Sequence, residues 1–249
     1  MSGDELGRIE AIAYMAMPGT EIGTPAPTGL ARPEPAPEPP TAEQPAATAG
    51  GEDARGWTVS TAERRAEVGP RVRLGRGSWV SPTASIAGDV VIGREVFVGP
   101  GASIRGDSGA RVHVGDASNV QDGAVVHALE GRSIVVGDRE YAVYIGERVS
   151  LAHQALVHGP AAIMDGCFVG FGATVINSAL GRGCVVMHRA YVSDVEVPAG
   201  RLVPVGAVVD TAERARSLPR VPRDVQEFAE GIVEANRRYA REYGESARG

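Results

Sequence analysis

The sequence is poor in aromatic residues and in cysteine, and each shortage excludes a class of protein. Its 249 residues include four Phe, six Tyr, two Trp and two Cys, against 33 Gly. A core of this composition must be built from Val, Ile, Leu and Ala. Two cysteines cannot supply the disulfide framework of a small secreted protein.

Long apolar runs and an excess of positive charge are also missing. No run approaches the ~20 apolar residues that span a bilayer. The N-terminus, MSGDELGRIEAIAYMAMPG, lacks the basic start and continuous apolar core of a secretory signal. The net charge of −6 gives no general attraction to nucleic acids or anionic membranes. We therefore expect a cytoplasmic protein with no nucleic-acid or membrane partner.

Residues 1–56 differ in composition from the rest of the chain. Eight prolines lie between Pro25 and Pro45, mixed with Ala, Glu and Thr. Such a segment cannot bury enough apolar surface to offset the entropy of ordering it, so we expect a disordered extension. Residues 4–17 within it could form a short amphipathic helix. This part of the chain is either a mobile tail or a docking peptide for a partner.

From residue 74 onward, aliphatic residues recur at every sixth position. The members are Leu74, Val80, Ile86, Ile92, Val98 and Ile104, then Val114, Val120 and Val126 after an insertion, then Ile145, Leu151, Val157, Ile163, Val169 and Val175, and finally Leu180, Val186 and Val192 after a one-residue deletion. A period of six fits neither a helix face nor a simple alternating strand. It is the signature of the hexapeptide β-helix.

In this fold each hexapeptide forms a short strand and a turn, and three of them close a triangular coil. Stacked coils satisfy each other's backbone hydrogen bonds. We therefore predict an all-β protein whose residues 57–212 form a left-handed parallel β-helix. A C-terminal helical segment, 213–249, follows and packs on it. The register also places Cys167 and Cys184 at small interior positions about one coil apart, near disulfide distance.

The C-terminal segment contains a helical pattern at residues 224–243, with Asp224 as a plausible N-cap. One stripe of this predicted helix carries Val225, Phe228, Ile232, Ala235, Tyr239 and Tyr243.

Three of the five histidines suggest a metal site. His127 and His158 each follow an interior aliphatic directly and so share a phase of the repeat, whereas His153 has a different phase. In one prism His153 and His158 would lie on adjacent faces, but in a trimer of prisms the two phases could meet at a subunit boundary. Three imidazoles and a water form a common catalytic zinc shell. Each histidine could also be structural, which is the role we assign to His113 and His188.

Two segments around these histidines carry a family resemblance. RGDSGARVHVGDASNVQDGAVVHALE (105–130) and EYAVYIGERVSLAHQALVHGPAA (140–162) resemble the gamma-class carbonic anhydrases and the anhydrase-like N-terminal domain of carboxysome scaffold proteins. The resemblance implies a homotrimer that hydrates CO2 reversibly to bicarbonate and a proton. His127, His153 and His158 would bind zinc or iron, with His153 supplied by the neighbouring subunit. A hydroxide on the metal would attack CO2.

The resemblance also implies roles for six further residues. Gln121 would orient the hydroxide, Asn119 would belong to the polar shell, and Arg105 and Asp107 would form an ion pair across the trimer interface. Asn236 falls where the family has an asparagine near the metal. Glu130 matches a carboxylate that relays protons.

The sequence departs from the family at two positions, which leaves other functions open. Efficient members have a glutamate where Ser108 stands, and some have a tyrosine where Glu234 stands. The chain could therefore be a carboxysome-type assembly protein with little activity. It could also be a metal-dependent hydrolase acting on another electrophile, such as a thioester. A hexapeptide acyltransferase is a weaker alternative, because that fold needs no metal shell.

Overall fold

The computed structural model describes residues 71–246. The predicted extension at 1–56 and its candidate helix at 4–17 lie outside the described residues. No helix between residues 71 and 246 is long and apolar enough to cross a membrane.

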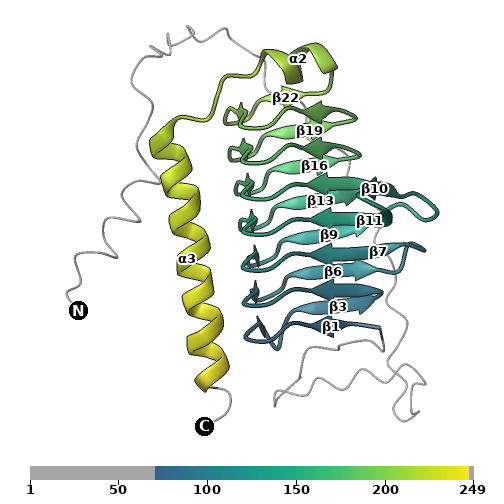
Figure 1. The fold of residues 1–249 in the computed structure, drawn as a ribbon, viewed down its shortest axis with the longest axis vertical. Helices are drawn as coiled ribbons and strands as arrows, with labels where there is room; N and C mark the ends of the chain where they lie inside the picture. The colour runs from purple at the N-terminus through teal and green to yellow at the C-terminus, as the bar shows by residue number, and fades with distance from the viewer. Residues whose placement is uncertain (1–70, 247–249) are drawn as a thin grey trace, which may run out of the picture. The chain divides into compact units, whose positions relative to one another are not determined.

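Three parallel sheets form the walls of a β-helix, and each contributes seven strands to the stack (Figure 1). Sheet 1 contains β1 (Arg73–Leu74), β4 (Val90–Ile92), β7 (Arg111–Val114), β11 (Arg139–Ile145), β14 (Ala161–Ile163), β17 (Ala179–Leu180) and β20 (Glu196–Val197). Sheet 2 contains β2 (Trp79–Val80), β5 (Phe97–Val98), β8 (Asn119–Val120), β12 (Ser150–Leu151), β15 (Phe168–Val169), β18 (Val185–Val186) and β21 (Leu202–Val203). Sheet 3 contains β3 (Ser85–Gly88), β6 (Ser103–Gly106), β9 (Val125–Ala128), β13 (Leu156–Gly159), β16 (Thr174–Ile176), β19 (Tyr191–Ser193) and β22 (Val208–Val209). The predicted fold class is therefore confirmed.

The aliphatic positions of the sequence repeat form three interior columns. In sheet 3, for example, Ile104 pairs with Val126 and Val126 with Val157 across successive coils. All three side chains are fully buried. Two members at the first coil are exceptions: Leu74 has 45% exposure and Val80 is partly buried, because β1 and β2 each have a sheet neighbour only on one side among the described residues. The hexapeptide period thus identified the core correctly.

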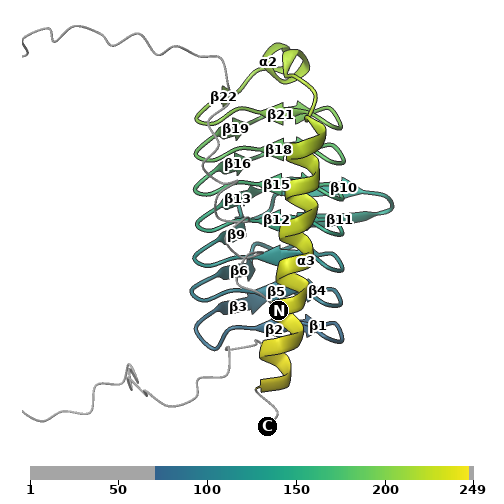
Figure 2. The ribbon, with the colours of Figure 1, turned by 90° about the vertical axis from the view of Figure 1, so that its left-hand side faces the viewer.

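The insertion after Val126 forms a hairpin that projects from the stack (Figure 2). Its strands are β10 (Ile134–Val136) and β11, which pair antiparallel. A register shift between Tyr141 and Val143 brings the far end of β11 back into line, so that Ile145 pairs with Val114. The extra residues are thereby kept outside the coil.

The C-terminal segment contains two helices, α2 (Ala212–Ser217) and α3 (Arg223–Ser246). Thr211 caps α2 by accepting a hydrogen bond from the Arg214 backbone N–H at 3.2 Å. The expectation that Asp224 caps the long helix is wrong. The helix begins one residue earlier, and Asp224 lies in its first turn, where a carboxylate still complements the helix dipole.

Helix α3 runs along the outside of sheet 2 (Figures 1 and 2). Its most buried residues are Ala229, Val233, Asn236 and Ala240. The predicted stripe therefore flanks the contact instead of forming its centre. Small residues at the centre allow close approach, and larger rings pack beside them. Phe228 lies 5.9 Å from Phe168, and Tyr243 lies 4.9 Å from Trp79, between ring centroids.

Candidate metal centre

His127 and His158 face each other on adjacent strands of sheet 3. They are register partners in β9 and β13, and their ring centroids are 5.4 Å apart at an interplanar angle of 75°. Each follows an interior valine, so the alternation of the strand turns both rings outward from the core. The shared phase in the sequence predicted this pairing.

Asp107 lies beside His127 and is held there by Arg105. An Asp107 carboxylate oxygen is 3.3 Å from Nε2 of His127, and the Arg105 guanidinium donates to the other oxygen at 2.8 and 3.0 Å. The hydrogen bond from Arg105 lowers the pKa of the Asp107 carboxyl below its usual value. Within one chain, therefore, Arg105 and Asp107 already form an ion pair beside the histidines.

The loop that presents Asp107 leaves the coil at a close contact between two backbones. A side chain at Gly106 would place its Cβ 2.3 Å from the carbonyl oxygen of Asp89, so only glycine fits. A cavity of about 310 Å³ opens here, with Asp107, Asp89 and Arg71 among its lining residues. Asp107 thus borders this cavity, whereas His127 and His158 are not among its lining residues.

A second polar group is buried in sheet 2. The Gln121 amide donates to Oδ1 of Asn119 at 2.9 Å, and the Asn119 amide donates to the hydroxyl of Ser150 at 2.8 Å. All three residues are buried, with at most 5% exposure. This chain of hydrogen bonds holds the side chain of Gln121 in place relative to Asn119 and Ser150.

His153 lies elsewhere, in the turn between β12 and β13. Its Nδ1 is 3.6 Å from a carboxylate oxygen of Asp122, and its ring stacks on Phe171 with centroids 5.3 Å apart and an angle of 24°. Phe171 in turn stacks on His188 at 4.4 Å and 8°. Within residues 71–246 no three His, Cys, Asp or Glu side chains converge closely enough to hold a metal ion. The phase of the repeat predicted that His153 lies on an adjacent face, whereas it occupies the corner turn.

The remaining predicted site residues are not in contact with the histidine pair. Glu130 is exposed in the turn after β9. Asn236 is buried on α3, where its amide donates to the carbonyl of Ile232 at 2.9 Å. Glu234 forms ion pairs with Arg148 and Arg237.

Ser108 has only 3% exposure, and its hydroxyl has no hydrogen-bond partner among the described residues. It cannot replace a solvent-facing carboxylate in proton transfer.

Two residues of this region, Ser150 and Phe171, were not predicted from the sequence, and His188 was assigned a structural role without a partner. The spacing contained a signal for Phe171 and its contact with His188, because 153, 171 and 188 are separated by 18 and 17 residues, which is one coil each. Residues at that spacing lie above one another in a β-helix. His188 also accepts a hydrogen bond from the Phe171 backbone N–H at Nδ1, at 3.0 Å. Burial lowers the pKa of His188, which favours this neutral, accepting form.

The side chains around His127 fit a zinc or iron ion if a third donor comes from outside the chain. Imidazole nitrogens are preferred zinc ligands. Asp107 stands at one ring nitrogen of His127, which leaves the other ring nitrogen available as a lone-pair donor. His127 and His158 would hold the ion, and the third ligand would be His153 of another copy.

Comparison with known proteins agrees with this fold. Residues 66–106 match the family model described as bacterial transferase hexapeptide (six repeats). A hexapeptide transferase family protein from Anaplasma phagocytophilum superimposes with a TM-score of 0.57 at 23% identity, covering 69% of this chain and 92% of that one. At this identity the likeness shows the fold alone. The chain is thus a hexapeptide-repeat β-helix protein.

Its curated relatives define the family. A carbonic anhydrase from Methanosarcina thermophila is 43% identical over 182 residues, which cover 68% of this chain and 74% of the relative. The carboxysome assembly protein CcmM is 47% identical in Synechococcus elongatus and 40% in Nostoc sp., over 70% and 72% of this chain. The chain belongs to the gamma-class carbonic anhydrase family. It spans about a third of the length of the carboxysome assembly proteins, 32% and 31%.

Proposed function

We propose that the chain is a carbonic anhydrase, a lyase that hydrates CO2 to bicarbonate and a proton at three sites between the subunits of a homotrimer. The observation that carries this proposal is the separation of the histidines. His127 and His158 are adjacent on sheet 3, whereas His153 lies in a corner turn and joins no metal-binding group formed by residues 71–246. A second copy would supply it.

The chemistry needs a hydroxide nucleophile at neutral pH. Zinc or iron held by the histidines would supply it by lowering the pKa of a bound water, to about 7 in the case of zinc. The protein must orient that nucleophile and admit CO2. Gln121 is the candidate for orientation, since Asn119 and Ser150 fix its amide. Asp107, 3.3 Å from Nε2 of His127, would orient that ring, and Arg105 lowers the pKa of the Asp107 carboxyl and so favours its ionised form.

Each turnover also releases a proton that must reach solvent. Glu130 is the candidate relay, because it is exposed three residues after His127. Ser108 contributes no ionisable group. We therefore expect hydration that is measurable but limited by proton transfer.

A second candidate function is that of an assembly module with little activity. Its support is the 47% identity to a carboxysome assembly protein together with the buried serine at position 108. The segment at 1–56, a possible docking peptide, would then tether the trimer to a partner in the cytoplasm.

Stopped-flow CO2 hydration on zinc-loaded and iron-loaded protein tests the first proposal, with metal content and native mass measured on the same samples. We expect a trimer with one metal ion per chain, hydration that rises with pH, and loss of both metal and hydration in His127→Ala. His113→Gln is the matched control and should retain both. A metal-loaded trimer that hydrates no CO2 in any buffer would contradict the anhydrase proposal and favour the assembly module.

A further inference from the structure

The two cysteines lie above one another in the interior of the β-helix. The Phe168 N–H donates to the Cys184 carbonyl at 2.9 Å, and the residues after the two cysteines, Phe168 and Val185, are register partners in β15 and β18. The Cα atoms of Cys167 and Cys184 are therefore one strand spacing apart, ~4.8 Å. Disulfides join Cα atoms ~4.4–6.8 Å apart. Both side chains are buried in the core.

The two cysteines belong to an interior column of small residues, one from each coil. Other members of this column make the same hydrogen bond without a thiol. Two coils of the column carry serines, whose hydroxyls donate to the next turn: Ser78 to Gly93 O at 2.7 Å and Ser118 to Gly146 O at 2.8 Å. Cys167 and Cys184 make the equivalent bonds to Gly181 O and Pro198 O, both at 3.1 Å. A serine can therefore replace either cysteine without loss of this contact. Unlike serine, however, two neighbouring cysteines can be oxidised to a disulfide.

The charge at the end of the column favours a thiolate. Arg201 occupies the position after Cys184, since Val185 N–H donates to its carbonyl at 3.0 Å. Its Nε is buried and has no partner among residues 71–246. The neighbouring Cys167 thiol lowers the pKa of the Cys184 thiol below its usual value, and the charge of Arg201 acts in the same direction. Burial raises the pKa of Cys167 well above its usual value. The pair thus combines an ionisable thiol with a protonated neighbour.

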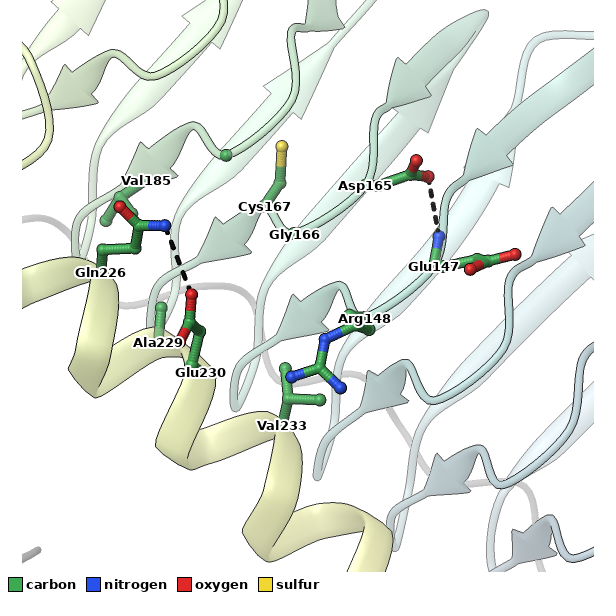
Figure 3. A pocket seen from close by; sticks show the side chains of 11 residues that line it. Glu147, Arg148, Asp165, Gly166, Cys167, Val185, Gln226, Ala229, Glu230 and Val233 are labelled. Carbon is green, nitrogen blue, oxygen red and sulfur yellow. Dashed lines mark hydrogen bonds between the residues drawn. The ribbon is translucent and has the colours of Figure 1, made fainter.

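The turns that carry the two cysteines border a cavity. A cavity of about 290 Å³ lies under α3, and its lining includes Cys167 together with Gly183 and Val185 on either side of Cys184. Figure 3 shows Ala229 and Val233 of α3 on one side of this cavity and Cys167 on the turns across from them. A molecule the size of a peroxide needs little more room than a water.

We propose that Cys167 and Cys184 are a peroxide-oxidisable dithiol that closes to a disulfide between adjacent coils. The Cys184 thiolate attacks one oxygen of hydrogen peroxide, which gives a sulfenic acid and releases hydroxide that takes a proton to become water. The sulfur of Cys167 then attacks the Cys184 sulfur and displaces hydroxide, which takes the Cys167 proton and leaves as a second water. Two thiols are oxidised, one peroxide is reduced, and a thiol reductant reverses the change. This site is independent of the proposed anhydrase function.

Arg182 makes the test direct, because trypsin cleaves between the cysteines. The full-length folded protein is treated with hydrogen peroxide, alkylated, denatured and digested. We expect the mass of two hydrogen atoms to be lost from the intact chain and tryptic peptides 149–182 and 183–189 to be joined. Dithiothreitol should separate them. A chain that remains reduced, gains oxygen on one cysteine or crosslinks to another chain would overturn the proposal.

Cys167→Ser and Cys184→Ser are the matched controls, since serine already occupies this column at Ser78 and Ser118. Neither variant should form the crosslink. Unfolded wild-type protein gives a second measurement that needs no variant. The crosslink should form at least 10-fold more slowly in denaturant, because the fold no longer holds the sulfurs together. Equal rates in the folded and unfolded chain would also overturn the proposal.

Discussion

The imidazole rings of His127 and His158 lie edge to face, 5.4 Å apart, on two strands that the sequence separates by the whole β10–β11 hairpin. Two ligands on one chain and a third from a neighbour give a prediction about mixed trimers. His127→Ala and His153→Ala should each abolish metal binding alone. Mixed in equal amounts and reassembled, they should restore roughly a quarter of the sites by random cyclic assembly. Metal content after reassembly and desalting measures this.

The control for that experiment is a mixture of His127→Ala with His158→Ala. His127 and His158 of one site come from the same copy, so every site at a subunit boundary of this mixture lacks one of the two ligands. Restoration in this mixture, or none in the first, would contradict a site shared between subunits.

Phe171 should matter for metal affinity because its ring fixes the plane of His153. Phe171→Leu keeps an apolar side chain but removes the stack, and we expect zinc affinity to fall by about 10-fold, as for other residues that orient a ligand. Competition with a chelator gives the affinity, and native mass reports the trimer. Phe171→Tyr should behave as wild type. If Phe171→Leu weakened the trimer without changing affinity in the trimers that remain, the ring would serve the interface only.

Glu130 should limit turnover at low buffer concentration. Glu130→Gln removes the proposed proton relay while keeping the shape, and we expect hydration to fall by about 10-fold in weak buffer. Added imidazole should restore the rate, because an external base replaces the relay. Glu140→Gln, which changes an exposed glutamate on the following β10–β11 hairpin, is the matched control. A loss that buffer does not rescue would place Glu130 in substrate positioning instead.

The buried hydroxyl of Ser108 should lower the free energy of unfolding. Ser108→Ala removes a hydroxyl without a partner, and we expect the free energy of unfolding to rise by about 1 kcal/mol. Ser118→Ala is the contrast, since the Ser118 hydroxyl donates to Gly146 O and accepts from Val149 N–H. That variant should lower stability. Urea titration measures both, and a destabilised Ser108→Ala would mean that the hydroxyl gains a partner in the assembled protein.

His113 should make stability depend on pH near neutrality. Burial between Tyr141 and Tyr144 lowers its pKa, Arg111 lowers it further, and Asp116 opposes them. The folded state then binds fewer protons than the unfolded state. The contribution of His113 is therefore complete above the unfolded pKa of about 6.5 and is lost as the pH falls below it. His113→Phe should flatten the melting temperature between about pH 7.5 and 5.5 relative to wild type. Tyr141→Phe, which keeps the imidazole, should not.

The sequence predicted the core because a β-helix repeats one backbone geometry in every coil. The interior role of Val126 or Val157 follows from its phase alone, and so does the pairing of His127 with His158. The helix on sheet 2 was predicted less well. Its contact is centred on Ala229 and Val233, because the close approach of α3 depends on tertiary packing, which helical periodicity does not contain.

The sequence predicted those parts of the site whose residues share a position in the six-residue repeat. It did not predict contacts that depend on the direction of a side chain. Phase could not show that the amide of Gln121 is held through Asn119 by Ser150. Nor could it show that Ser108 is buried, because that residue lies in an insertion outside the repeat. The stack of His153, Phe171 and His188 was visible as a coil-length spacing, but its ring contacts depend on rotamers.

The hairpin β10–β11 offers a position for adding new sequence. Although Val126 and Ile145 are nineteen residues apart instead of six, Ile145 still stacks on Val114, because the shift at Tyr141 returns the chain to the coil. Gly137 at the hairpin tip has a positive φ of 65°, and Val135, two residues before it, is 64% exposed. A fluorescent peptide or an affinity tag inserted at this tip would lengthen only the hairpin. The spacing between the coils that carry His127 and His158 would stay that of two neighbouring strands.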